Sequence, residues 1–117
     1  MPRLEIRRGD VVVVTLEPSV GKEQRSLRRP CIIVQNDVGN QYSPTTIVVP
    51  LTDAAGKEVY PFQALVRKDD SGVDKDSIAK CEQVRVIDRQ RIMKKLGNLS
   101  VDAIGRLDAA LRISLAL

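Results

Sequence analysis

Arg29 and Thr52 are the two residues of the chain best placed to act on a phosphate group. Arg29 directly precedes Pro30 and the apolar run 31–34, which predicts a core strand that would hold the arginine in place. A rigidly held guanidinium offers a planar fork of donors that suits a phosphate carrying extra negative charge. Thr52 ends another predicted strand, 45–52. If these two strands pair antiparallel, both side chains come to the same end of the sheet.

The polar segment that leads to Arg29 is the second candidate. It shows no periodicity and predicts a loop, in which basic residues outnumber carboxylates: Lys22, Arg25, Arg28 and Arg29 against Glu23, with Gln24 between them. The common interpretation of such a stretch is a solvated loop, and the alternative is a loop that faces phosphates. Thr52 has a similar alternative, as an ordinary threonine at a strand end. From these features alone, the sequence predicts only a basic α+β domain.

The chain has no histidine, which removes the commonest general acid–base group and the commonest metal ligand. Its two cysteines, Cys31 and Cys81, lie far apart in apolar runs, so we expect buried thiols in a reducing cytoplasm. Segment 36–40 offers a single carboxylate, too few for a calcium loop. We therefore expect neither a metal ion nor another cofactor.

Size and charge are compatible with a small intracellular protein. The 117 residues are typical of one domain, expected to span 1–117. The formal net charge of +4 and the pI of about 9.3 permit a nucleic-acid partner without requiring one. The N-terminus lacks an apolar stretch of signal length, and no apolar run is long enough to span a membrane.

Hydrophobic patterning predicts strands first and one helix last, typical of an α+β fold with a small, strongly bent sheet or barrel. Strands are expected at 11–16, 30–35, 45–52, 62–66 and 76–87, the last with a bulge or bend, and loops at 36–44 and 53–58. One short helical turn capped by Asp88 is expected after them. The final helix should begin at the cap Ser100, and it has an apolar stripe of Ile104, Leu107, Leu111 and Leu115.

Several motifs, in this order along the chain, resemble the MazF/PemK toxin family, and the resemblance extends from about Arg7 to Leu117. The motifs are Arg8–Val11, Val20–Gln24, Arg29-Pro30, Gln35–Thr45, Pro50–Thr52, Leu65–Ser77, Glu82–Asp88 and Leu111–Leu115. The resemblance implies a small SH3-like β-barrel of the PemK/CcdB type with a C-terminal α-helix, assembled as a homodimer. It also implies an endoribonuclease that cuts single-stranded mRNA at short sequences without a metal ion. The implied products carry 2′,3′-cyclic phosphate and 5′-hydroxyl ends.

In this family the catalytic arginine and threonine match Arg29 and Thr52. The implied inhibitor is a cognate antitoxin with an acidic, partly apolar tail. The loop before the catalytic arginine departs from the family pattern, because Lys22 stands where a small serine is usual. We therefore expect RNA sequence preference to be the property that can least be carried over from the family to this chain.

Two matters stay open at the level of sequence. The general base could be Arg29, as the family suggests, or the nearby Glu23, although an arginine is a poor base. The same fold also occurs in toxins that bind DNA gyrase and cleave nothing, and a plain RNA-binding adaptor would be a third class. Residues expected to contact RNA are Lys22, Gln24, Arg25, Tyr60 and Gln83.

Overall fold

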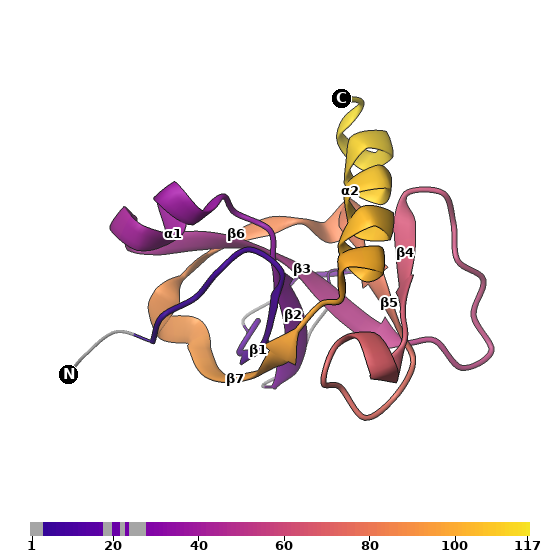
Figure 1. Ribbon diagram of the computed structural model, residues 1–117, viewed down its shortest axis with the longest axis horizontal. Coiled ribbons are helices and arrows are strands. Elements are labelled where there is room, and N and C mark those ends of the chain that lie inside the picture. Colours follow the sequence, from indigo (N-terminus) through magenta and orange to yellow (C-terminus); the bar gives the residue numbers. More distant parts are fainter. Residues whose placement is uncertain (1–3, 18–19, 22, 24–27) are drawn as a thin grey trace.

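The computed structural model describes residues 4–17, 20–21, 23 and 28–117. Within these residues the fold has seven strands and two α-helices (Figure 1). The strands are β1 (Asp10–Val14), β2 (Arg29–Ile33), β3 (Thr45–Asp53), β4 (Gln63–Val66), β5 (Ser77–Lys80), β6 (Arg85–Asp88) and β7 (Ile92–Asn98). The helices are α1 (Asp37–Tyr42) and α2 (Val101–Leu115), with single 3₁₀ turns η1 (Lys68–Asp70), η2 (Cys81–Gln83) and η3 (Arg89–Arg91).

All strand pairs are antiparallel, and the strands follow the order β4-β5-β3-β2-β1-β7. On the side of β3 opposite β2, its first half pairs with β6 and its second half with β5. The turn η2 separates β5 from β6, which confirms the bend expected within 76–87. Among the described residues the pairing leaves β4, β6 and β7 as edges, so the sheet is strongly bent and open rather than closed into a barrel.

The sheet carries an apolar cluster on each of its faces. Helix α2 covers one of them and contacts β4, and its fully buried residues Ala103 and Leu107 belong to the same cluster as Val49 and Leu51 of β3. The other cluster holds Cys31 together with Ile6, Val12, Val14, Leu16, Ile33, Val48 and Ile87. Because β1 contributes to both clusters, it is buried along its whole length, as its unbroken valine run predicts.

The expectation of a loop at 36–44 is wrong, because these residues include the helix α1. Asn36 caps it, since the side-chain oxygen of Asn36 accepts from the backbone N–H of Gly39 at 2.8 Å. Asn40 turns inward and is buried, where its side-chain oxygen accepts a hydrogen bond from the Thr46 hydroxyl at 2.8 Å. The hydrogen-bonded, buried side chain of Asn40 thus stabilises the short helix α1, in a segment whose composition alone predicts a loop.

Strand β7 was not expected from the sequence. Lys94, Lys95 and Gly97 interrupt its apolar pattern, and its register with β1 shifts at two positions. An exposed edge strand with bulges loses the alternation by which strands are recognised. The turn expected after Asp88 is confirmed, because the Asp88 carboxylate accepts from the backbone N–H of Gln90 at 2.8 Å.

Helix α2 begins at its predicted cap, where the Ser100 hydroxyl accepts from the backbone N–H of Ala103 at 3.1 Å. Of the predicted stripe, Leu107 and Leu111 are buried, whereas Leu115 remains 50% exposed. Among the described residues, no helix is long and apolar enough to cross a membrane.

Candidate active site

The pairing of β2 with β3 brings Arg29 and Thr52 together. Cys31 lies opposite Pro50 in the antiparallel register, and continuing that register by two residues places Arg29 opposite Thr52. Nη1 of Arg29 donates to the carbonyl oxygen of Leu51 at 3.3 Å. The guanidinium is therefore tied to the strand that carries the threonine, as the sequence predicts if these strands pair antiparallel.

Both side chains line one open pocket of about 390 Å³ at this end of the sheet. Its other walls come from the end of β3, from the segment 72–77 and from β7: Pro30, Leu51, Asp53, Gly72, Val73, Asp74, Lys75, Ser77 and Leu96. Lys75 lies 3.8 Å from the Asp53 carboxylate. This ion pair offsets one negative charge of the pocket, which favours an anionic ligand beside Arg29.

The wall formed by segment 72–75 is fixed by close backbone packing. Gly72 has a φ of +81°, and a Cβ at this position would lie 2.7 Å from the carbonyl oxygen of Leu96. Asp70, just before it, accepts from the Ser100 hydroxyl and from Nη2 of Arg106, both at 2.9 Å. These two donors, the serine first, lower the pKa of Asp70, so at neutral pH its carboxylate anchors the wall to α2.

On its other side, Thr52 contacts a residue that sequence reasoning missed. Nζ of Lys57 donates to Oγ1 of Thr52 at 3.1 Å. The sequence predicts only a turn here, and nothing in its composition shows that the turn returns the lysine to Thr52. The Asp53-Ala-Ala-Gly56 pattern typical of a tight turn was the one available signal.

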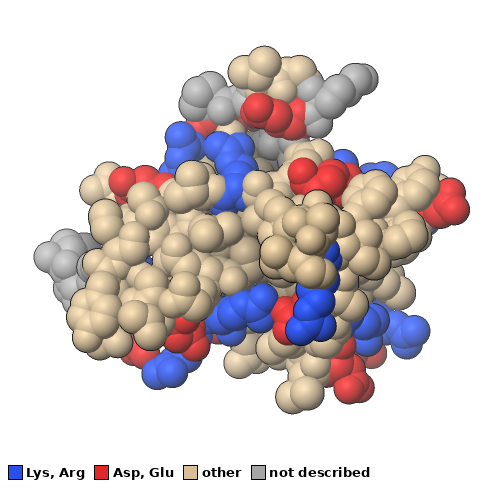
Figure 2. All heavy atoms as spheres, turned by 90° about the horizontal axis from the view of Figure 1, so that it is seen from above, with Lys and Arg blue, Asp and Glu red and all other residues tan. Residues whose placement is uncertain are grey.

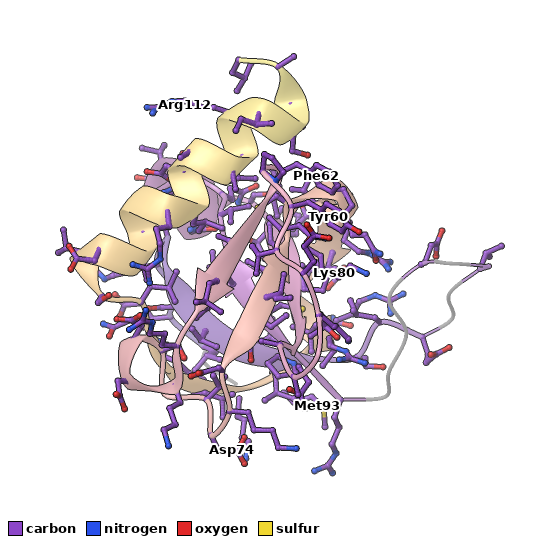
Figure 3. The ribbon with its side chains drawn as sticks, turned by 90° about the vertical axis from the view of Figure 1, so that its right-hand side faces the viewer. Tyr60, Phe62, Asp74, Lys80, Met93 and Arg112 are labelled. Carbon is purple, nitrogen blue, oxygen red and sulfur yellow. The ribbon has the colours of Figure 1, made fainter. Side chains whose placement is uncertain are left out.

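A second pocket of about 290 Å³ lies beyond Thr52, and the predicted RNA-contacting residue Tyr60 lines it. Lys57, Glu58, Gln63, Ile78 and Lys80 complete its walls. Tyr60 and Phe62 stack with ring centroids 5.6 Å apart, and Tyr60 remains 48% exposed. Figure 3 shows both rings and Lys80 at the upper right of the molecule and Asp74 at the bottom. An exposed aromatic face next to cations suits an unpaired base.

Glu23 and Gln83 line a third pocket, of about 610 Å³, together with Glu82, Val84, Arg85 and Val86. The Glu23 carboxylate accepts from the backbone N–H of Val20 at 2.9 Å. Neither residue lines the pocket of Arg29 and Thr52. The described residues among the predicted ones thus lie in three pockets, of which those of Arg29 and Tyr60 share Thr52. Lys22, Gln24 and Arg25 lie outside the described residues.

The pKa of the Cys31 thiol in β2 depends on burial and on the charges of two nearby arginines. Burial raises the pKa of the Cys31 thiol to about 12, while the charges of Arg29 and Arg85 act in the opposite direction. Burial also raises the pKa of Cys81 to about 12. Both cysteines are free and buried, as expected, and remain neutral thiols at physiological pH. Within the described ranges, no three His, Cys, Asp or Glu side chains gather as a metal site requires.

Residues 7–115 match the family model described as PemK-like, MazF-like toxin of type II toxin–antitoxin system. The chain belongs to this family. The resemblance inferred from the motifs is thereby confirmed.

Individual relatives agree in sequence and in fold. Endoribonuclease MazF of Staphylococcus epidermidis is 45% identical over 112 residues, which cover 96% of this chain and 92% of that protein. The crystal structure of MazF (Form-I) from Deinococcus radiodurans superposes with a TM-score of 0.80 at 21% identity, over 97% of this chain and 99% of that chain. A mycobacterial endoribonuclease in complex with its cognate antitoxin gives a TM-score of 0.79 at 18% identity, with 96% of both chains covered. At such identities the two structures show a shared α+β fold.

Proposed function

We propose that this protein is the toxin of a toxin–antitoxin module and an endoribonuclease that cuts single-stranded mRNA at short sequences. The observation that carries the proposal is the shared pocket of Arg29 and Thr52 at one end of the β2–β3 pair. The 45% identical staphylococcal relative bears the name endoribonuclease. We assign the bent sheet to the family's SH3-like fold, although its described strands do not close into a barrel, and we assign the protein to the cytoplasm, where mRNA is found.

In the proposed reaction the RNA supplies its own nucleophile. The 2′-hydroxyl next to the scissile bond loses its proton, and its oxygen bonds to phosphorus. The bond from phosphorus to the 5′-oxygen breaks, and that oxygen takes up a proton. The products are a 2′,3′-cyclic phosphate and a 5′-hydroxyl, and no water is consumed. Arg29 and Thr52 donate hydrogen bonds to the phosphoryl oxygens, whose negative charge grows as the fifth bond forms.

The proton acceptor is Arg29 or Glu23. The contact of Glu23 with the Val20 amide and its separate pocket favour a role in substrate recognition. Glu23→Gln removes a base while keeping size and hydrogen bonding. If Glu23 is the base, this variant cuts the preferred site slowly in single-turnover kinetics. If Glu23 reads sequence, the variant cuts at an unchanged rate but selects different sites.

Digestion of a long transcript in excess EDTA tests the proposal. The reaction described above draws only on the RNA and on side chains, so we expect discrete fragments whose pattern Mg²⁺ does not alter. Loss of cutting in EDTA that Mg²⁺ restores would contradict the metal-free reaction. Intact RNA together with inhibited DNA gyrase would instead indicate the non-catalytic toxins of this fold, and RNA bound but uncut would indicate an adaptor.

Duplex RNA should resist cutting. Tyr60 and Gln83 are placed to stack on or read unpaired bases, and a duplex hides those faces and edges. The measurement compares a labelled oligonucleotide containing one cleavage site, alone and annealed to its complement, at equal concentration. A matched oligonucleotide with two mismatches across the site is the control, because it restores cutting only if pairing itself is inhibitory. Equal rates for single strand and duplex would refute this assignment.

We also propose a homodimer whose shared groove takes RNA and, alternatively, the acidic, partly apolar tail of a cognate antitoxin. A pocket of about 370 Å³ lies between α2 and the sheet, where the apolar residues Leu111, Leu115 and Leu117 stand beside Arg8 and Arg112. Leu117 is 87% exposed. Seen from above in Figure 2, the face at which α2 ends carries a broad uncharged area with charged residues around it. Such a patch is typical of a partner surface.

Light scattering at micromolar concentration tests the assembly. We expect the mass of two chains, and a larger mass with the antitoxin, whose addition should block RNA cutting. Added salt should weaken antitoxin binding without abolishing it, because salt screens ionic contacts and apolar burial persists. A single-chain mass for the free protein would remove the dimer, and an antitoxin that binds without inhibiting would remove the shared groove.

A further inference from the structure

We propose that Lys57 is a positioning residue of the cleavage reaction, which sets the hydrogen of the Thr52 hydroxyl for donation to the phosphate. The inference rests on the proposed function and adds a residue to it. Its basis is the 3.1 Å hydrogen bond from Nζ of Lys57 to Oγ1 of Thr52. Thr52 lines both the pocket of Arg29 and the pocket of Tyr60, and Lys57 lines only the second. The threonine thus stands between the two cations.

The direction of this hydrogen bond follows from the chemistry of the two groups. An ammonium group has three donors and no acceptor, so the Thr52 oxygen must be the acceptor. A hydroxyl has a single hydrogen and two lone pairs, and the lysine occupies one lone pair. The hydrogen is then directed away from Lys57, and we propose that it is donated to the phosphate beside Arg29. The positive charge also polarises the hydroxyl, which makes it a stronger donor.

The turn between Thr52 and Lys57 is built to return the lysine to the end of the strand. The Asp53 carboxylate accepts from the backbone N–H of Ala55 at 2.9 Å, and the N–H of Lys57 donates to the carbonyl of Ala54 at 3.1 Å. Gly56 has a φ of +69°, which closes the turn at low steric cost. The N–H of Ala54 also donates to the carbonyl of Asp76 at 3.0 Å, which ties the turn that carries Lys57 to the start of β5.

The ammonium group of Lys57 has a hydroxyl and not a carboxylate as its hydrogen-bond partner. Within the described part of the chain, Lys57 takes part in no ion pair, whereas Lys75 is paired with Asp53 and Lys95 with Asp10. A lysine that serves only solubility needs no fixed partner, yet this one donates to a hydroxyl at the proposed site. Lys57 contacts Thr52, and Thr52 would in turn contact the phosphate, so only the threonine separates the positive charge from the substrate.

The test is single-turnover cleavage of a single-site RNA oligonucleotide by purified protein, with the maximal rate and the half-saturating concentration measured separately. Removing one preorganised donor costs about 10²–10³ in rate, and we expect the indirect loss in Lys57→Gln to lower the maximal rate about 10-fold. Half-saturation should stay within about twofold, because Lys57 acts on the transition state through Thr52. Lys57→Arg, which keeps a charged donor, should recover most of the rate.

Two comparisons separate positioning from other roles. Lys94→Gln removes an exposed lysine on β7 that lines none of the pockets described, and it should cut at the parental rate. In a Thr52→Ala background, Lys57→Gln should have no further effect, because residues that act as a unit are not additive.

An unchanged maximal rate for Lys57→Gln overturns the inference, and so does a loss confined to half-saturation or one that persists in full without Thr52. RNA left intact by the parental protein overturns the proposed function and this inference with it. Because that outcome is visible before any variant is compared, the two failures are distinguishable.

Discussion

Replacing Arg29 by alanine should lower the rate of RNA cleavage by about 10²–10³ while leaving the fold intact, because one preorganised donor to the transition state is lost. The guanidinium contacts the carbonyl oxygen of Leu51 and lines the pocket into which Thr52 faces. Arg29→Lys should recover little of the rate, because an ammonium keeps the charge but lacks the planar fork. The measurement is single-turnover cleavage of a single-site oligonucleotide, with thermal unfolding of each variant followed in parallel.

The matched control is Arg67→Ala, which removes an exposed arginine that does not line this pocket. It lowers the net charge by the same amount, so it reports any general loss of attraction for RNA. Thr52→Ser should retain more activity than Thr52→Val, because the serine keeps a hydroxyl and the valine keeps only the shape. If Arg29→Ala cuts at the parental rate, the site assignment is wrong.

Gly72→Ala should destabilise the protein by about 3 kcal/mol, because a strained backbone conformation and a forced backbone shift each cost roughly 1–3 kcal/mol. The φ of +81° disfavours any side chain, and the new methyl group would lie 2.7 Å from the Leu96 carbonyl oxygen. Segment 72–75 is also a wall of the pocket of Arg29 and Thr52, so we expect cleavage to slow as well. Urea unfolding and single-turnover cleavage measure the two effects.

Gly56→Ala separates the steric contribution from the conformational one. Gly56 also has a positive φ, of +69°, but nothing lies within 4 Å of the position that a Cβ would take. Only the conformational penalty applies, and it is about 1–2 kcal/mol. Equal losses of stability for the two variants would show that the close approach of Gly72 to β7 does not matter.

The position of Arg29 and Thr52 at one end of a strand pair could be predicted from the sequence in more detail than most of the surrounding fold. The Arg29-Pro30 pair before an apolar run and Thr52 after another are local signals, and antiparallel pairing then leaves little choice about where they meet. The start and the buried face of helix α2 could also be predicted, because its cap and the spacing of its buried leucines both lie within one short stretch of sequence.

Other parts depend on contacts between residues distant in the sequence, which leave no local pattern. Helix α1 depends on the buried hydrogen bond between Asn40 and Thr46. Strand β7 depends on pairing with β1, which lies near the other end of the sequence. The contact of Lys57 with Thr52 depends on the conformation of a turn whose composition predicts only that it turns. Likewise, the separation of Glu23 from the pocket of Arg29 follows from tertiary packing and not from its place near Arg29 in the chain.

The central claim is that the pocket of Arg29 and Thr52 cleaves RNA by transfer to the 2′-oxygen. The most direct measurement is mass spectrometry of the ends produced from a single-site oligonucleotide in EDTA, beside a copy whose only change is 2′-deoxyribose at the cut. We predict a 2′,3′-cyclic phosphate and a 5′-hydroxyl from the first, no cutting of the second, and formation of both products slowed about 10²–10³-fold with Arg29→Ala. Cutting of the 2′-deoxy copy, or a 5′-phosphate at the new end, would contradict the account.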